Sequence, residues 1–367
     1  MKVLMIAESQ DGHWGRHIGL WLARAGVDIR FIFKTGSSTA NFLREQGLQV
    51  QELPLRGRFD LHSLRAIRDT LRSFKTDVIH AYTAKTCWLA IWAQWPKKRS
   101  GLVYYRGAIR RLLRWNPNDW LLFFSDWVDC IECNSTAIRE TLIASGVANE
   151  RVVVNHYGHL PEWYAAASAP DQWAKKPGRF RIGCVANYRK VKGLETLVDA
   201  VDMLHRDGMD FELLLVGEDK DGTLAGYVAR SAGRQHVTLT GPNSSPWGLM
   251  RTFDCLVIPS FLEGLPKVAV ESLACGIPVI ASNVGGLPEI IQNEWNGLLV
   301  PPGDPLALAR AISSFIKNPS LRDTFRENGY QFFRERFHLD LTRNRLMDLY
   351  QHVKSGKITA PAARLEN

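Results

Sequence analysis

The 367-residue sequence has no apolar stretch that approaches the ~20 residues required by a membrane-spanning helix. Its first apolar run, Val3–Ala7, is too short for the core of a signal peptide and is typical of a buried strand. Only Cys130 and Cys133 of the six cysteines form a C-x-x-C, and no second pair completes a zinc site. We therefore expect a protein of a reducing compartment, with no metal site, whose cysteines are small core residues.

A dinucleotide-binding fingerprint is also missing. No G-x-G-x-x-G follows the first predicted strand, and Gly12, Gly15 and Gly19 form only a looser series. This absence argues against an ordinary NAD-dependent dehydrogenase. Gly12 fits two interpretations equally well, a plain strand-to-helix turn or a backbone that closely approaches a ligand.

No acidic residue occurs between Asp77 and Asp119, in a chain whose formal net charge is +9. The interval from residue 85 to residue 115, here called the basic aromatic segment, contains Lys85, Lys97, Lys98, Arg99, Arg106, Arg110, Arg111 and Arg114 together with Trp88, Trp92, Trp95, Tyr104, Tyr105 and Trp115. Such a segment suits an anionic membrane face, a phosphorylated acceptor or nucleic acid. It equally suits a solvated basic face above a core of aromatic side chains, and these alternatives stay open.

Strand-like and helix-like runs alternate in both halves of the chain. The first half begins with a strand at Val3–Ala7, a helix at Gly12–Ala25 and a strand at Asp28–Phe33, which predicts a parallel sheet. A segment rich in proline and small residues, Pro161–Gly178, then reads as a linker and hinge. The second half restarts with a strand at Phe180–Val185. The length and this pattern predict an α/β protein of two domains.

The most informative stretch runs from Asp254 to Gly303. It reads as a strand at Asp254–Ser260, a loop, a helix at Lys267–Cys275 and a second strand at Pro278–Ser282. The loop therefore lies at the carboxyl end of a parallel strand and at the amino terminus of a helix. Free backbone N–H groups and the helix dipole make such a place suitable for a phosphate group.

Two carboxylates lie in this stretch, Glu263 in the loop and Glu271 within the helix. A carboxylate accepts hydrogen bonds, and its two oxygens suit a vicinal diol such as a ribose. Apolar neighbours are expected to bury Glu271 partly, and it then needs hydroxyl or cationic partners. Spacing alone leaves a second interpretation open, in which Glu263 is a surface acid and Glu271 is a solvated helix acid.

This stretch resembles the signature of the retaining glycosyltransferases of family four, which have the GT-B fold. The resemblance rests on the two acids and on the strings PVIAS, GGLPE and GLLVP that follow them in the expected order. It implies that Glu263 contacts hydroxyls of a donor sugar and that Glu271 binds the ribose of a nucleotide-diphosphate sugar. It also implies that loop amides around Lys267 and Val268 meet the distal phosphate.

The GT-B resemblance implies two Rossmann-like domains that face each other across a cleft, the first for the acceptor and the second for the nucleotide sugar. The predicted bounds are residues 1–165 for the first domain and 166–335 for the second. A C-terminal helix, residues 336–354, is expected to cross back onto the first domain, and residues 355–367 form a tail. Leu346, Leu349, Tyr350 and Val353 provide the apolar stripe of that helix.

The diphosphate motif departs from the family pattern at one position. Lys192 aligns with the lysine that usually binds the diphosphate, but Asn187 occupies the usual arginine position, so the arginine role passes to Arg189. Both cations neutralise a diphosphate without a metal ion. We predict Glu263, Arg189 and Lys192 as catalytic residues. The alternative is a basic turn before a helix.

Further residues are implied by the resemblance to contact the nucleotide sugar. The predicted set is Glu271, Gly264, Leu265, Lys267, Val268, Gly241 and Pro242, of which the last two resemble the loop beside the base. A D-x-D at Asp219 and Asp221 resembles the metal-diphosphate motif of another glycosyltransferase fold, but hard cations need more oxygen ligands than this pair supplies. No metal is therefore expected.

The first domain matches the family less closely. The strand Asp77–Ala81 often ends in a pair of histidines, and here His80 and Tyr82 occupy these positions, so the second histidine is absent. Arg106 stands where many relatives carry a histidine before glycine. We predict Gly12, His80, Tyr82 and Arg106 as acceptor or cleft residues. The alternatives are a satisfied core histidine and a plain surface arginine.

These observations predict a retaining glycosyltransferase that moves a sugar from a nucleotide-diphosphate sugar to a hydroxyl of a cell-envelope glycan or lipid-linked acceptor. The process would be lipopolysaccharide or exopolysaccharide biosynthesis, without a cofactor and with UDP slightly favoured over GDP. We expect a cytoplasmic location with peripheral contact to the inner membrane face through residues 85–115, and nucleic acid is not an expected partner. The alternatives are a GT-B nucleotide-sugar epimerase or phosphorylase, and a basic nucleic-acid- or membrane-binding protein without turnover.

Overall fold

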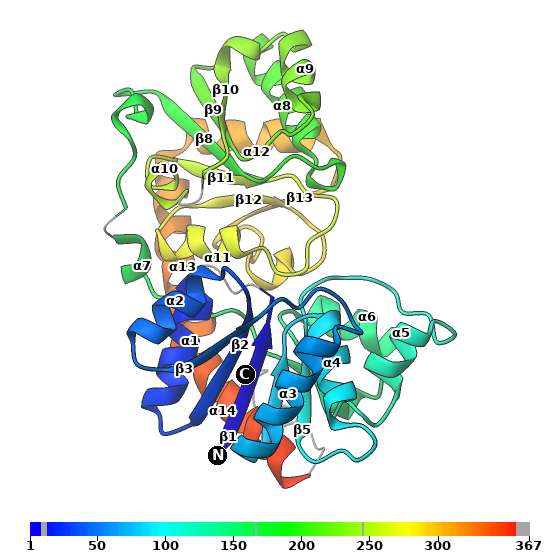
Figure 1. Ribbon diagram of the computed structural model, residues 1–367. Helices are drawn as coiled ribbons and strands as arrows, with labels where there is room; N and C mark the ends of the chain where they lie inside the picture. Colours follow the sequence, from blue (N-terminus) through cyan, green and yellow to red (C-terminus); the bar gives the residue numbers. More distant parts are fainter. Residues whose placement is uncertain (9–12, 166, 244–245, 357–367) are drawn as a thin grey trace. The chain divides into compact units, whose positions relative to one another are not determined.

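The computed structural model describes residues 1–8, 13–165, 167–243 and 246–356 (Figure 1). The chain divides into two compact units. Unit 1 comprises Met1–Gly158 and the C-terminal segment that begins at Leu339, and unit 2 comprises His159–His338. Each unit contains one parallel sheet with helices on it, which confirms the predicted α/β class and the two Rossmann-like halves.

The sheet of unit 1 has seven parallel strands in the order β3-β2-β1-β4-β5-β6-β7. Their bounds are β1 Lys2–Ala7, β2 Asp28–Lys34, β3 Gln49–Leu53, β4 Val78–Ala81, β5 Gly101–Arg106, β6 Cys130–Cys133 and β7 Val152–Val154. The central strands β1 and β4 are buried along nearly their whole length because helices cover both faces of a parallel sheet. The strand order reverses between β1 and β4, the arrangement typical of Rossmann-like sheets.

The helices of unit 1 follow the strands in the usual βα alternation. They are α1 His13–Arg24, α2 Ser38–Glu45, α3 Leu61–Phe74, α4 Ala84–Gln94, α5 Pro117–Asp119, α6 Thr136–Ala144 and α14 Leu339–Ser355, with short helical turns at Trp120–Phe124 and Asn149–Arg151. Local chemistry fixes several bounds. The side chain of Asp60 caps α3 by accepting a hydrogen bond from the Ser63 amide, and the helix ends at Lys75 in the left-handed conformation.

The C-terminal helix α14 packs on β4, β5 and α1 of unit 1 (Figure 1). Gly101 at the start of β5 permits this approach, because a Cβ atom there would lie 2.3 Å from Cγ1 of Val353. A buried polar contact adds to the packing, since Nδ1 of His80 lies 2.8 Å from the Tyr350 hydroxyl. The C-terminal helix predicted to return to the first half is therefore present.

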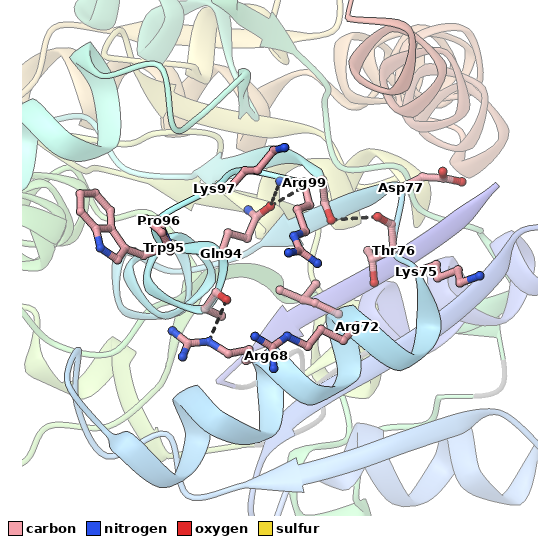
Figure 2. Close-up of a pocket in the computed structure, with 13 residues that line it drawn as sticks. Arg68, Arg72, Lys75, Thr76, Asp77, Gln94, Trp95, Pro96, Lys97 and Arg99 are labelled. Carbon is pink, nitrogen blue, oxygen red and sulfur yellow. Dashed lines mark hydrogen bonds between the residues drawn. The ribbon is translucent and has the colours of Figure 1, made fainter.

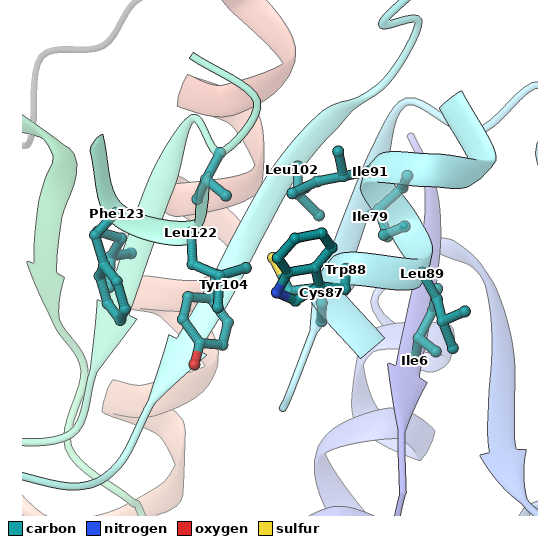
Figure 3. Close-up of a cluster of buried hydrophobic side chains, with 14 of the residues drawn as sticks. Ile6, Ile79, Cys87, Trp88, Leu89, Ile91, Leu102, Tyr104, Leu122 and Phe123 are labelled. Atoms are coloured by element: carbon teal, nitrogen blue, oxygen red, sulfur yellow. The ribbon is translucent and has the colours of Figure 1, made fainter. Parts of the chain in front are cut away.

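The core of unit 1 contains part of the basic aromatic segment (Figure 3). Trp88 is 9% exposed and Tyr104 is 2% exposed, whereas Trp95 and Trp115 are 53% and 81% exposed. The segment is therefore not one aromatic surface. Helix α4 and strand β5 turn part of its aromatic side chains inward, where they pack between the sheet and the helix.

The sheet of unit 2 has six parallel strands in the order β10-β9-β8-β11-β12-β13. Their bounds are β8 Phe180–Val185, β9 Phe211–Val216, β10 Val237–Gly241, β11 Cys255–Ile258, β12 Val279–Ser282 and β13 Gly297–Val300. The helices are α7 Glu162–Ala165, α8 Leu194–Arg206, α9 Thr223–Arg230, α10 Trp247–Met250, α11 Lys267–Ala274, α12 Pro305–Lys317 and α13 Pro319–Arg336, with 3₁₀ turns at Asp171–Trp173, Lys190–Lys192, Arg234–His236 and Leu287–Glu289.

Two apolar cores stabilise unit 2. One packs α8 and α12 against the sheet through residues such as Leu197 and Phe315, and the other packs α11 and α13 through residues such as Val270 and Phe333. The strand order reverses between β8 and β11. Ligands of such sheets bind beyond the carboxyl ends of the strands at this reversal, so a site is expected at the loops after β8 and β11.

Candidate functional site

The loops after β8 and β11 meet at the carboxyl edge of the unit 2 sheet. The Phe261 amide donates a hydrogen bond of 2.8 Å to the Val191 carbonyl, which ties the second loop to the first. The first loop closely approaches the end of β11 at Gly193. The φ of this glycine is +63°, and a Cβ atom there would lie 2.1 Å from the Pro259 carbonyl oxygen. Only glycine combines that backbone conformation with that contact. The position of Lys192 is thereby fixed against the end of β11.

Lys192 and Glu263 form the central ion pair of the site. Nζ of Lys192 lies 2.6 Å from Oε1 of Glu263, and the same oxygen accepts a 2.7 Å hydrogen bond from the Ser260 hydroxyl. Both charged side chains are largely buried, at 19% and 10% exposure. Partial burial strengthens such a charge-assisted contact and makes loss of either partner costly.

A cavity of about 250 Å³ lies around this ion pair. Its lining includes Lys192, Ser260, Glu263, Pro266, Lys267 and Val268. The last two residues open helix α11, whose first-turn N–H groups have no partner within the helix. The structure thus combines a lysine, a carboxylate and a helix amino terminus around one cavity, an arrangement that suits an anionic group with hydroxyls beside it.

Glu271 lies one helical turn beyond the amino terminus of α11. Burial raises the pKa of its carboxyl group to about 7, although a hydrogen bond from the Trp247 side chain and the charge of Lys267 both favour the ionised form. The group is half-buried and titrates near neutral pH. A carboxylate in this state gains from a ligand that donates hydrogen bonds to it.

A second cavity, of about 520 Å³, adjoins the first, since Cys184 and Ala186 line both. Its lining further includes Tyr188, Leu215, Gly217, Leu239, Gly241 and Pro242. The lining also includes the charged residues Glu218, Asp219 and Lys220. Apolar side chains and backbone beside such polar groups suit a flat ring with polar substituents. The two cavities together accommodate an elongated ligand with an anionic part and a flat part, and both lie entirely within unit 2.

The remaining residues of the first loop lie elsewhere. Arg189 is exposed and lines neither cavity. Asn187 fastens the loop to its neighbour, because its side-chain oxygen accepts a 2.9 Å hydrogen bond from the Glu218 amide. On the loop after β9, Asp219 lines the larger cavity, and the carboxylates of Asp219 and Asp221 accept hydrogen bonds from the first amides of α9. Within the described ranges, no group of three or more His, Cys, Asp or Glu side chains gathers as a metal site would require.

The candidates in unit 1 are mostly buried. His80 is fully buried, and its Nε2 lies 3.0 Å from Oε2 of Glu132, while its other ring nitrogen faces Tyr350. Tyr82 stacks on His80 and is 6% exposed. Arg106 is half-buried with its guanidinium over the Phe123 ring. These contacts stabilise the unit.

The fourth candidate, Gly12, lies outside the described residues. The predicted positions that line the unit 2 cavities are therefore Lys192, Glu263, Lys267, Val268, Gly241 and Pro242. Glu271 lies one helical turn further along α11.

Three residues of the site were not predicted from the sequence. Ser260 could have been found, because it is the first polar residue after an apolar strand and precedes Glu263 by three positions. Tyr188, which donates a 2.6 Å hydrogen bond to Glu195 beside the larger cavity, and Trp247, which bonds Glu271, have no local signal. The partner of Tyr188 is seven positions away and that of Trp247 is in the next helix, so neither contact follows from a local motif.

Family comparisons agree with this geometry. Residues 167–332 match the model of glycosyl transferases group 1, and residues 16–158 match that of the glycosyl transferase 4-like domain. The two matches follow each other without overlap and take in most of both units. The chain belongs to the group 1 glycosyltransferases. In this glycosyltransferase both cavities lie within the stretch matched by the group 1 model.

Curated relatives of this glycosyltransferase match over different lengths. An uncharacterized glycosyltransferase of Methanocaldococcus jannaschii is 38% identical over 144 residues, which cover 38% of this chain and 39% of the relative. The chain therefore spans less than half the length of this relative. The lipopolysaccharide core biosynthesis glycosyltransferase LpsE of Rhizobium meliloti is 28% identical over 332 residues, covering 86% of this chain and 93% of LpsE.

The fold of this glycosyltransferase is GT-B. The crystal structure of Anabaena HepE in complex with UDP-glucose matches with a TM-score of 0.78 and 20% sequence identity, covering 96% of this chain and 99% of HepE. The likeness extends over both units. At this level of identity it shows the architecture alone.

Proposed function

We propose that this glycosyltransferase transfers a sugar, with retention of anomeric configuration, from a UDP-sugar to a hydroxyl of a cell-envelope glycan or lipid-linked acceptor. The observation that carries the proposal is the Lys192–Glu263 pair, 2.6 Å apart, in a cavity at the amino terminus of α11. The resemblance to HepE, which was solved with UDP-glucose, supports UDP as the nucleotide. The similarity to LpsE supports a cell-envelope acceptor.

The donor would occupy the two adjoining cavities. The base enters the larger cavity beside Gly241 and Pro242, and the ribose hydroxyls donate to Glu271. The diphosphate reaches the first turn of α11 and the ammonium group of Lys192. Glu263 accepts hydrogen bonds from hydroxyls of the donor sugar.

Catalysis in this scheme is electrostatic. The bond between the anomeric carbon and the diphosphate breaks, the acceptor oxygen bonds to the same face of that carbon, and the acceptor proton passes to the leaving phosphate oxygen. Negative charge grows on the diphosphate as its bond breaks, so Lys192 and the α11 amides stabilise the transition state more than the ground state. We assign Arg189 to the same role, without a metal ion, because it lies on the turn that carries Lys192.

We further propose a cytoplasmic protein that contacts the membrane peripherally. Exposed side chains of the basic aromatic segment and the adjacent residues support this proposal: Leu113, Trp115 and Trp120 are exposed beside Arg111 and Arg114. Aromatic and basic side chains together favour an anionic lipid surface. No helix in the described part of the chain has the length and apolarity needed to cross a bilayer.

A thermal-shift panel tests the nucleotide site. UDP, GDP, ADP, dTDP and CMP would each be added to the native protein, to Glu271→Ala and to Glu327→Ala, whose exposed acid lies on α13 outside both cavities. We expect UDP to raise the Tm of the native protein and of Glu327→Ala, since a ligand at a hundredfold excess over Kd adds about 2.7 kcal/mol of stability. Glu271→Ala should lose this shift. Shifts that are equal in all three proteins, or absent from all, would refute the nucleotide site.

The affinity for UDP should also depend on pH. The pKa of Glu271 is about 7 in the free protein, and the ribose binds the ionised carboxylate, so affinity should rise as pH increases through 7. Between pH 6 and pH 8 the ionised fraction changes about tenfold, and we expect the Kd to fall by about the same factor. Calorimetric titrations of the Glu271→Gln variant measure the part of the pH dependence of Kd that is due to titration of the UDP phosphate itself. An identical pH profile in this variant would contradict the assignment.

A further inference from the structure

A third cavity, of about 390 Å³, lies in unit 1 at the opposite edge of its sheet from the strand ends where ligands of such folds usually bind (Figure 2). It is enclosed by the end of α3, the end of α4 and the residues that lead into the starts of β4 and β5. It shares no lining residue with the donor cavities of unit 2. Its size is that of a small-molecule site.

The lining of this cavity is strongly cationic. It includes Arg68, Arg72, Lys75, Lys97 and Arg99 but only one acid, Asp77. That carboxylate already accepts hydrogen bonds from the Lys354 ammonium at 2.9 Å and the Lys2 amide at 2.8 Å. The cavity therefore has an excess of positive charge that its own acid does not neutralise.

Three arginine side chains line the cavity, and those of Arg72 and Arg99 are exposed. Figure 2 shows Arg68 and Arg72 on α3 facing Arg99 on the opposite side. Arg68 is held by the carbonyls that end α4, at 3.0 Å from Trp92 and 3.2 Å from Ala93. Arg72 and Arg99 form no ion pair with any residue that the structure describes. Like charges so arranged repel one another, and an anion between them would relieve the repulsion.

Two buried polar groups also lack a partner at this cavity. Thr76 and Gln94 are each 6% exposed, and their Oγ1 and Nε2 atoms have no hydrogen bond within the described residues. The side-chain oxygen of Gln94 fixes the orientation of its amide group, because Oε1 accepts hydrogen bonds of 3.0 and 2.8 Å from the backbone amides of Arg99 and Ser100. The NH₂ group of the Gln94 side chain therefore has no hydrogen-bond acceptor among the described residues. Both atoms are covered by the cavity wall, so they lower the stability of this wall but do not contact a ligand directly.

An exposed aromatic ring completes the cavity. Trp95 is 53% exposed, and its ring contacts Trp92 and Trp127 with centroid separations of 5.7 Å in both cases. These contacts hold the indole in place while leaving much of it to solvent. A fixed aromatic face beside a cationic cavity suits a ligand that has an apolar ring face and an anionic group.

We propose that this cavity binds the phosphate monoester group of a phosphorylated sugar. Arg72 and Arg99 hold the phosphate by charge-assisted hydrogen bonds. The sugar ring packs on Trp95. The site is separate from the donor cavities and provides this glycosyltransferase with a second point of attachment for a phosphorylated glycan. A lipid headgroup with a phosphate monoester shares the same chemistry.

Calorimetric titration with glucose 6-phosphate, inorganic phosphate and glucose tests the proposal. The variant Arg72→Ala/Arg99→Ala is compared with Arg24→Ala/Arg65→Ala, which removes the same charge from exposed arginines outside the cavity. We expect the first variant to weaken glucose 6-phosphate binding at least tenfold and the second by less than twofold. Trp95→Ala should weaken glucose 6-phosphate but leave inorganic phosphate unchanged, and glucose alone should not bind.

Flotation with vesicles of phosphatidic acid in phosphatidylcholine identifies the source of the phosphate. Vesicle binding without glucose 6-phosphate binding, if Arg72→Ala/Arg99→Ala abolishes it, supports the site with a lipid headgroup as its ligand. Equal behaviour of the two double variants towards both probes overturns the proposal. A native far-ultraviolet circular dichroism spectrum and a cooperative thermal transition show that each variant is folded. Should the alanine variant not fold, Arg72→Lys/Arg99→Lys keeps the charge, loses the forked geometry and should still weaken binding severalfold.

Discussion

Replacement of Lys192 by alanine should lower kcat by roughly 10²–10³-fold, the effect of removing one preorganised group that stabilises developing negative charge. Its ammonium group lies 2.6 Å from Glu263 and lines the cavity at the amino terminus of α11. In the variant, the diphosphate leaves without its nearest cation. The Glu263 carboxylate also loses its counter-charge and keeps the hydrogen bond from the Ser260 hydroxyl. The measurement is the initial rate with a UDP-sugar that supports turnover by the native enzyme.

Two neighbouring cations serve as controls for this experiment. Lys190→Ala removes the same charge from an exposed position on the same turn, and we expect its rate to stay within about twofold of native. Arg189→Ala tests the arginine role directly, and a fall in kcat of about tenfold or more would support it. If Lys192→Ala and Lys190→Ala have similar rates, the proposed stabilisation of the leaving group is wrong.

Replacement of Gly193 by alanine should destabilise unit 2 by about 3 kcal/mol or more, because a strained left-handed residue and a steric clash act together. The backbone has φ +63°, and the new Cβ would lie 2.1 Å from the Pro259 oxygen. That oxygen belongs to rigid backbone at the end of β11, so the loop that carries Lys192 must move. Urea unfolding would show the loss of stability, and the UDP thermal shift should shrink with it.

Gly226→Ala is the matched control, since the same methyl group is added within α9. A Cβ atom there meets only the Nη1 atom of Arg230, at 3.7 Å, and the backbone is helical. Alanine is favoured over glycine in a helix by about 1 kcal/mol, so this variant should be as stable as the native protein or slightly more so. Equal unfolding midpoints for the two variants would show that the Gly193 contact is not required.

The predicted secondary structure is most accurate where local signals are strong. The strand at Phe180–Val185 has the predicted bounds, because all its residues except Arg181 are apolar or glycine. Helix α4, by contrast, was not recognised within the basic aromatic segment. Its residues are buried nearly all round, so no polar face gives it a period.

The sequence by itself determined the α/β class, the division into two halves and the loop–helix motif that contains Glu263 and Glu271. Local propensities and turn residues act over a few positions, and these features depend on nothing longer. Only the tertiary structure decided that Lys192 pairs with Glu263, 71 positions later, and that Trp247 bonds Glu271. The order of the strands brings those segments together. It also places Arg72 and Arg99 around one cavity whose lining has an excess of positive charge. Contacts between distant segments depend on which strands become neighbours, and no residue encodes that order locally.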